Sequence, residues 1–167
     1  QICKEFENKT KLSDLQDKHP SFNVDVNKVY FNNDEVGLIV SQNKLYKWLD
    51  EVNPNWKNLT NKTLNPDEAL LNKTNNTLYI IEKKYQETEG SVDEKLQTFH
   101  FKIWFYEKIT KDLNINIDFA YLLSDWFFEK KYTQGWREGT LKYQEILDYL
   151  DLNNINVFRK EIPLDYL

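Results

Sequence analysis

The sequence predicts an α/β domain in which a mixed central β-sheet is flanked by helices. Apolar runs occur at 69–71 and 78–81, and residues 115–123 alternate before becoming wholly apolar; apolar residues at helical spacing separate the last two segments. Glycine and proline number four each and aromatic residues make up 15% of the chain, a composition typical of a packed core. We therefore expect residues 1–167 to form a single domain, with residues 1–40 as a peripheral N-terminal extension.

The first 54 residues contain three expected elements. Leu12 and Leu15 indicate a short helix, and alternation of apolar and polar residues over 22–30 predicts one strand. Ser41 is a suitable N-cap for a short amphipathic helix. That helix should stop before Pro54, because proline disfavours helical backbone in the residue that precedes it.

The middle of the chain predicts a β-hairpin, because two apolar runs flank the polar turn 73–76. Ser91 followed by Glu94 is a capping box, and apolar residues then recur at helical spacing as far as Tyr106, which predicts one long helix packed on the sheet. The remaining expected elements are a central strand beside the second hairpin strand (115–123), an aromatic segment (126–132), a helix (135–149) and a final short strand (155–158).

Ionisable side chains are expected to meet at the polar end of the hairpin. Successive strand residues point to opposite faces, so Glu82, Lys84 and Gln86 project from one face. The turn folds Asp67 back toward Glu82, which brings two carboxylates and a lysine into one small volume. Such a group suits Mg²⁺, a hard ion that binds one or two protein carboxylates and substrate phosphate oxygens.

Each of these residues has an expected role. Asp67 and Glu82 bind the metal, and Lys84 stabilises charge developing on phosphorus or helps to deprotonate an attacking water. Gln86 orients that water or a phosphate oxygen. The alternative interpretation is structural, because charged strand ends discourage aggregation of sheet edges and Pro-Asp is a common turn pair.

The same residues resemble a known nuclease motif. The resemblance to PD-(D/E)xK nucleases rests on Pro66-Asp67 and, after fourteen intervening residues, on Glu82-Lys83-Lys84. Residues 90–98 resemble the helix start that often follows this motif in type II restriction-endonuclease-like members, and the core resemblance covers residues 40–125. Residues 121–127 and 161–164 are similar to uncharacterised restriction-enzyme-like proteins.

The resemblance implies a restriction-endonuclease-like core and a Mg²⁺-dependent DNA endonuclease, with Mn²⁺ as the alternative ion. Cleavage would leave a 5'-phosphate and a 3'-hydroxyl. The main-chain carbonyl of Lys83 is expected as a further metal ligand, and Glu35 or Glu51 either supplies a third acid or is an ordinary solvated carboxylate.

A type II restriction enzyme acting on double-stranded DNA is the leading hypothesis. The alternatives are a structure-specific repair or junction-resolving nuclease, and a catalytically inactive nuclease fold that binds DNA or protein. The complete set of Asp67, Glu82 and Lys84 argues against the inactive fold.

Contacts to DNA are expected around the metal. Ser91, Lys95 and the helix N-terminal amides would hold phosphate oxygens, and Lys73 is a further DNA-binding candidate. Lysines gather between residues 44 and 102, so a locally basic cleft could hold a duplex despite the net charge of -5. The alternative is that these lysines are ordinary solvated side chains.

An apolar stripe of Phe101, Trp104 and Phe105 on the long helix requires another helix or a second subunit to cover it. Packing is the expected role of these side chains, in preference to stacking on DNA. Cleavage of a palindrome on both strands would also favour a homodimer with two-fold symmetry.

Composition excludes several other classes. Cys3 is the only cysteine, which excludes an intrachain disulfide and favours the cytoplasm, and no apolar run reaches the ~20 residues of a membrane span. His19 and His100 are too few for a zinc site, and no glycine-rich phosphate loop is present. Because the chain starts at Gln1, we expect further residues upstream.

Overall fold

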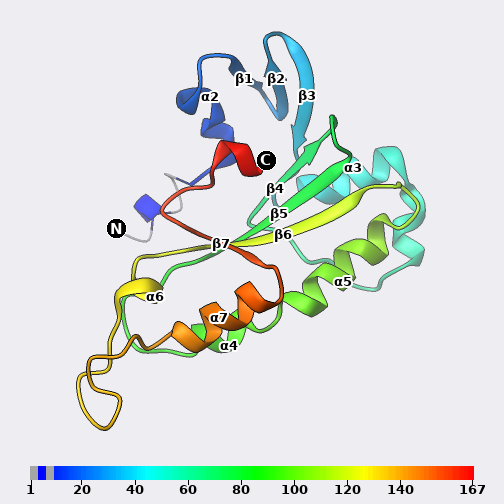
Figure 1. The fold of residues 1–167 in the computed structure, drawn as a ribbon. Coiled ribbons are helices and arrows are strands. Elements are labelled where there is room, and N and C mark those ends of the chain that lie inside the picture. Colours follow the sequence, from blue (N-terminus) through cyan, green and yellow to red (C-terminus); the bar gives the residue numbers. More distant parts are fainter. Residues whose placement is uncertain (1–3, 7–9) are drawn as a thin grey trace.

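The structure is a computed structural model that describes residues 4–6 and 10–167. Within the described residues, seven strands form one sheet in the order β1-β2-β3-β4-β5-β6-β7 (Figure 1). Neighbouring strands are antiparallel from β1 to β5, whereas β5, β6 and β7 are parallel. The strands are β1 (Phe22–Asp25), β2 (Lys28–Phe31), β3 (Asp34–Ile39), β4 (Glu68–Asn72), β5 (Thr77–Lys84), β6 (Asn116–Leu123) and β7 (Asn156–Arg159).

Helices cover both faces of this sheet. One face packs against α3, α4, α5 and α7, with Leu78, Ile80 and Tyr121 in its core, and Figure 1 shows the last three of these helices on the same side of the sheet. The other face packs against η1, α2 and η3, with Ile81 and Leu122 in its core. The helices are η1 (Leu12–Asp14), α2 (Leu15–Lys18), α3 (Lys44–Val52), η2 (Pro54–Asn58), α4 (Val92–Leu96), α5 (Phe99–Thr110), α6 (Trp126–Glu129), α7 (Gln144–Leu152) and η3 (Leu164–Tyr166).

The mixed sheet with flanking helices confirms the predicted fold class. The β4–β5 hairpin forms around the turn 73–76, and β6 lies beside β5 as expected. Both faces of β5 are buried from Thr77 to Glu82, which is why its sequence is apolar without interruption over 78–81. This hairpin sets the orientation of Asp67, Glu82 and Lys84.

The expected single strand over 22–30 is wrong, because the chain reverses within it. β1 and β2 form a hairpin whose turn includes Val26 at a positive φ of 57°. The next strand, β3, was not expected at all, and it joins this hairpin to β4. Residues 22–39 therefore add three strands to the central sheet, while the division of the chain into one domain and an extension stays a prediction.

The expected N-cap at Ser41 is also wrong. Helix α3 has Asn43 at its N-cap position. The Ser41 hydroxyl instead donates to Glu68 Oε2 at 2.9 Å and accepts from the Ala69 amide at 3.0 Å. Ser41 thus ties the segment after β3 to the start of β4.

The predicted long helix over 92–106 is two helices. Ser91 makes no side-chain capping bond, which contradicts the capping box, and α4 ends at Leu96. At the break the amides of Gln97 and Thr98 donate to carbonyls only three residues back, and the Thr98 hydroxyl donates to the Lys95 carbonyl at 2.7 Å. The side-chain bond competes with a continuous helical ladder, so α5 starts anew at Phe99.

The helix expected over 135–149 begins only at Gln144. Gly135 and Gly139 both have positive φ, at 83° and 81°, which is left-handed backbone that a right-handed helix does not contain. A bridge between Lys131 and Leu141 closes this segment as a loop.

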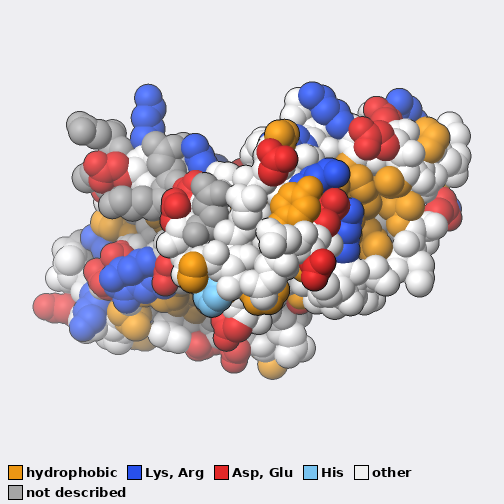
Figure 2. Space-filling model, turned by 90° about the horizontal axis from the view of Figure 1, so that it is seen from above, with side chains coloured by type: hydrophobic (Ala, Val, Ile, Leu, Met, Phe, Trp, Pro, Cys, Tyr) orange, Lys and Arg blue, Asp and Glu red, His pale blue; other side chains and the backbone are white. Residues whose placement is uncertain are grey.

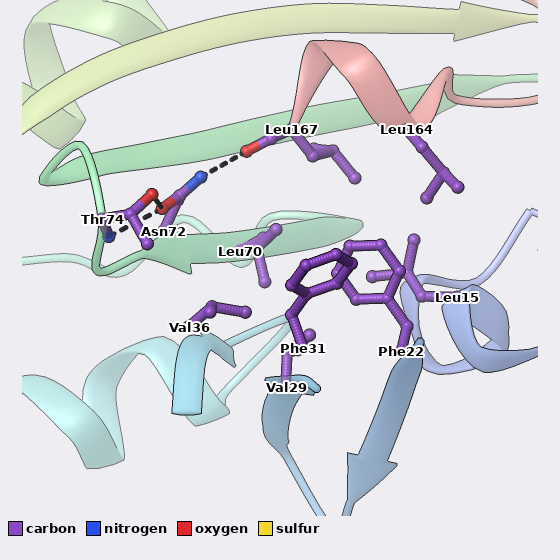
Figure 3. A pocket seen from close by; sticks show the side chains of 11 residues that line it. Leu15, Phe22, Val29, Phe31, Val36, Leu70, Asn72, Thr74, Leu164 and Leu167 are labelled. Carbon is purple, nitrogen blue, oxygen red and sulfur yellow. Dashed lines mark hydrogen bonds between the residues drawn. The ribbon is translucent and has the colours of Figure 1, made fainter. Parts of the chain in front are cut away.

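An apolar pocket of about 240 Å³ lies between the β1–β3 strands and the C-terminal turn (Figure 3). Phe22, Phe31 and Leu164 point into it, and the Asn72 side chain donates to the Leu167 carbonyl at 2.6 Å along its edge. No lining residue is ionisable, so this pocket offers neither an acid nor a base for catalysis.

Candidate active site

Strand register brings the first two residues of the site together. Glu68 is the partner of Ile81 in the antiparallel ladder, so one step further along the chain places Asp67 opposite Glu82. Both lie at the end of the hairpin away from the turn 73–76. Two carboxylates therefore lie side by side at one end of these two central strands.

Lys84 completes the cluster. Its Nζ lies 3.1 Å from Glu82 Oε2, 3.7 Å from Asp67 Oδ2 and 3.1 Å from the Lys83 carbonyl oxygen. These three oxygens are the three metal ligands that the sequence suggests. All of them surround one ammonium group, so they converge on a position where a cation is already favoured.

The Asp67 carboxylate is fixed by the backbone. Its Oδ2 accepts a hydrogen bond from the Lys83 amide at 2.8 Å. Burial, followed by the neighbouring charge of Glu82, raises the pKa of Asp67, while the hydrogen bond and two lysines oppose that shift. An additional cation beside Asp67 would favour its charged form, because it would relieve the repulsion between the two carboxylates.

Lys102 is a member of the site that the sequence analysis did not single out. It comes from α5, and its Nζ donates to Glu82 Oε2 at 2.5 Å. Glu82, whose side chain is only 7% exposed, therefore contacts two lysines. A signal was present, because Lys102 is a lone cation between Phe101 and Ile103, but only packing shows which strand it meets.

Lys83 points to the opposite face of the sheet, as strand parity predicts. Its Nζ donates to Glu68 Oε1 at 2.7 Å, and both side chains are only 9% exposed. Glu68 also accepts from the Ser41 hydroxyl and, at 3.4 Å, from the Leu12 amide. The two consecutive acids of Asp67-Glu68 thus serve two different faces.

Gln86 lies two residues past the end of β5. Its Nε2 donates to the Thr88 carbonyl at 2.7 Å and to the Tyr143 hydroxyl at 3.2 Å, and its backbone bonds to Ser124. Its Oε1 is buried with no hydrogen-bond partner among the described residues. No described contact joins Gln86 to either carboxylate, so its water-orienting role stays a prediction.

The expected phosphate-binding residues are not brought to the carboxylates by any described contact. The Tyr121 hydroxyl, on the strand neighbour of Glu82, donates to the Leu96 carbonyl at 3.1 Å. This bond ties the C-terminal end of α4 to the site, whereas Ser91 is at its N-terminal end. The roles of Ser91 and Lys95 stay predictions.

Two further candidates lie away from the site. Lys73 is in the β4–β5 turn and forms an ion pair with Glu35, at the end of the hairpin opposite Asp67. Five residues of β5 separate that end from Glu82, which is about 17 Å of strand. Glu35 therefore cannot share an ion with Asp67, and Glu51 is exposed on α3 with no described contact to the site.

Most lysines of the expected basic cleft already have acidic partners. Five of these lysines have a carboxylate oxygen within 4.0 Å of the ammonium nitrogen, namely Lys57, Lys73, Lys83, Lys84 and Lys102. On the face seen in Figure 2, basic and acidic side chains are interspersed rather than gathered by sign. Local pairs of opposite charge therefore involve most of these lysines, and the locally basic cleft stays a prediction.

The oxygen donors fit a hard divalent ion. Among the described residues there is no group of three or more His, Cys, Asp and Glu side chains that could hold a metal. Two carboxylates and a main-chain carbonyl are nevertheless a donor set that Mg²⁺ accepts, since it usually keeps several waters and takes the rest of its shell from substrate.

A family model for the PD-(D/E)XK nuclease superfamily domain matches residues 18–120, more than half of the chain. The chain belongs to this superfamily. Asp67, Glu82 and Lys84, on which the motif resemblance rests, all lie inside the matched range of this PD-(D/E)XK protein. No curated protein and no solved structure was found to match it. Within the described residues of this PD-(D/E)XK protein, none of the helices has the length and apolar character needed to cross a membrane.

Proposed function

We propose that the protein is a metal-dependent DNA endonuclease of restriction type that hydrolyses phosphodiester bonds. The observation that supports this proposal best is the convergence of Asp67, Glu82 and the Lys83 carbonyl on the Lys84 ammonium. Membership of the nuclease superfamily gives this cluster its chemical meaning.

Asp67, Glu82 and the Lys83 carbonyl would hold the ion, which is Mg²⁺ or Mn²⁺ in this proposal. When bound, the ion supplies positive charge to the phosphate and lowers the pKa of a bound water. The Asp67 side chain is 37% exposed, so a phosphate can approach it from solvent. Lys84 lies within the same cluster, where its charge acts on the phosphate group as negative charge develops there.

Digestion of supercoiled plasmid DNA tests the proposal. Wild-type protein should nick or linearise the plasmid with Mg²⁺ or Mn²⁺ and leave it intact with EDTA. Lys84→Ala should lose this activity, whereas Lys111→Ala, at the exposed end of α5, should keep it. Equal cleavage in EDTA, or a Lys84→Ala variant as fast as wild type, would refute the assignment.

The products separate the alternatives. Discrete fragments from linear duplex DNA support a restriction enzyme, and cutting confined to branched or gapped DNA supports a structure-specific nuclease. Binding of DNA without cleavage under any of these conditions would instead identify an inactive nuclease fold.

A further inference from the structure

A surface groove of about 640 Å³ lies between α5 and the loop that follows η2. Phe101 and Trp104 line it, and they are 45% and 50% exposed, so the apolar stripe expected to be covered is open at these two residues. Phe105, the third member, is buried beneath them. The remaining lining residues are Asn58, Leu59, Thr60, Asn61, Lys62 and Lys108.

The groove combines flat apolar surfaces with positive charge. The rings of Phe101 and Trp104 have centroids 5.6 Å apart. Lys62 Nζ lies 4.6 Å from the centre of the Phe101 ring, and Lys108 Nζ lies 5.0 Å from the Trp104 ring. Among the described residues, neither lysine forms a salt bridge with an acid, so both charges remain available to an anion.

Both walls of the groove lead directly to the candidate active site. On α5, Phe101 is followed by Lys102, which contacts Glu82. On the other wall, Lys62 precedes Asp67 by five residues, a span of at most about 18 Å of extended chain. A strand of nucleic acid with a phosphate at the carboxylates could therefore reach the groove within a few nucleotides.

We propose that this groove is a stacking subsite for an unpaired base of the DNA strand that the active site cleaves. The inference rests on the metal-dependent cleavage proposed above and, of the substrates considered there, favours DNA with a single-stranded segment near the scissile phosphate over intact duplex. Bases stack on aromatic side chains whatever their sequence, while lysines neutralise the adjoining phosphates. Asn58 and Asn61 supply amides at the rim of the same groove.

A second copy of this chain fits the groove less well. A two-fold contact places the same surface on both sides, so the charges of Lys62 and Lys108 from both copies would be brought into one interface. Like charges brought together in this way oppose association. DNA carries the complementary charge.

Binding of a short fluorescent single-stranded DNA, followed by anisotropy in Ca²⁺, tests the proposal without requiring cleavage. Trp104→Ala should bind on the order of 5-fold to 150-fold more weakly than wild type, the range measured for loss of one base–aromatic stack. Trp104→Phe should restore most of the affinity, because it keeps a stacking ring. Phe31→Ala is the matched control, since Phe31 is a half-exposed aromatic on β2 that packs against Phe22, and no lysine of the described residues lies over its ring.

A second strand containing abasic positions identifies the contact as base stacking. Wild type should lose affinity for the abasic strand, and Trp104→Ala should not distinguish it from the normal strand. Unchanged affinity in Trp104→Ala, or conversion of a dimer to a monomer by this substitution with DNA binding intact, would overturn the subsite. If wild type cleaves plasmid and Trp104→Ala still binds normally, only the subsite fails, whereas absence of cleavage with Mg²⁺ and with Mn²⁺ defeats the proposed function itself.

Discussion

Replacing Lys83 by methionine should strongly destabilise the protein, although Lys83 points away from the candidate active site. The substitution keeps the length of the side chain and removes its charge. Glu68 would then stay buried at 9% exposure without the ammonium that lies 2.7 Å from its carboxylate in the native structure. Because Lys83 lies on the face opposite the candidate active site, we expect its loss to affect stability far more than cleavage.

The expected magnitude follows from the burial of the pair. Removing one partner of a buried ion pair costs about 3–5 kcal/mol, because the remaining charge is left uncompensated. Glu68 retains hydrogen bonds from the Ser41 hydroxyl and the Leu12 amide, which favours the lower end, about 3 kcal/mol. For a chain of this length that loss lowers the melting temperature by about 6–12 °C.

Urea and thermal unfolding at pH 7 measure this loss, with Lys111→Met as a matched control on the surface. Lys83→Met/Glu68→Gln should recover much of the stability, because glutamine carries no charge and still accepts the bonds from Ser41 and Leu12. A loss below about 1 kcal/mol in Lys83→Met, or a double variant no more stable than the single one, would show that the pair is not the buried contact described here.

Four further outcomes concern the site itself. Lys84→Ala should cleave on the order of 10²-fold more slowly than wild type while its duplex affinity in Ca²⁺ stays within about two-fold, as measured by plasmid digestion and anisotropy. Wild type should bind duplex DNA more tightly when Ca²⁺ is added. In EDTA, Asp67→Asn should bind the duplex better than wild type, because the substitution removes one negative charge. No change in either comparison would show that Asp67 does not face the DNA. The pKa of Asp67 is raised in the folded state, so this carboxyl group contributes fully to stability only below pH 3.8, its ordinary pKa, and the contribution is lost as the pH rises through the folded pKa. Asp67→Asn should therefore have a higher melting temperature than wild type at pH 7 in EDTA. This advantage should disappear in acid. Lys102→Ala should bind Mn²⁺ more tightly than wild type by calorimetry, since one cation that competes for Glu82 is gone, and equal affinities would contradict that competition.

The hairpin at the centre of the fold could be predicted because its signals are local. The apolar run 78–81 and the polar turn 73–76 fix two strands, and parity then fixes the faces of Glu82 and Lys84. β3 gave no such signal, because Asp34, Glu35 and Gly37 are poor strand formers that are held by pairing with β2 and β4. Pairing with the neighbouring strands, rather than local sequence preference, therefore determines that β3 forms.

The errors in the helices have a related cause. A capping box at Ser91 and helical spacing up to Tyr106 are both satisfied by the sequence, yet the helix breaks at Thr98 where a side-chain hydrogen bond to the backbone competes. Periodicity reports which residues face the core, and it does not report whether the backbone between them is continuous. The sequence therefore predicted which sides of α4 and α5 are buried, although it wrongly predicted one continuous helix.

The part of the site that belongs to the β4–β5 hairpin could be predicted from the sequence. Glu82 and Lys84 lie on β5 and Asp67 immediately precedes β4, and the register of these two strands follows from a short turn. Lys102 is twenty residues from Glu82 and arrives from a helix, so its partner depends on how α5 packs on the sheet. From its position in the sequence, Lys73 was expected near the site. The length of the hairpin strands instead places it at the opposite end of the hairpin.

Lys102 changes the electrostatic argument for the whole site. With Asp67 and Glu82 opposed only by Lys84, the cluster would carry one net negative charge and would repel a phosphate. With Lys102 included, two carboxylates face two ammonium groups, and the cluster is neutral before any metal binds. A divalent ion then changes the local charge from zero to positive rather than from negative to positive. In the proposed function, a protein with a net charge of -5 can therefore admit a DNA strand at this site, because the acids proposed to hold the ion are neutralised there by lysines from two different elements.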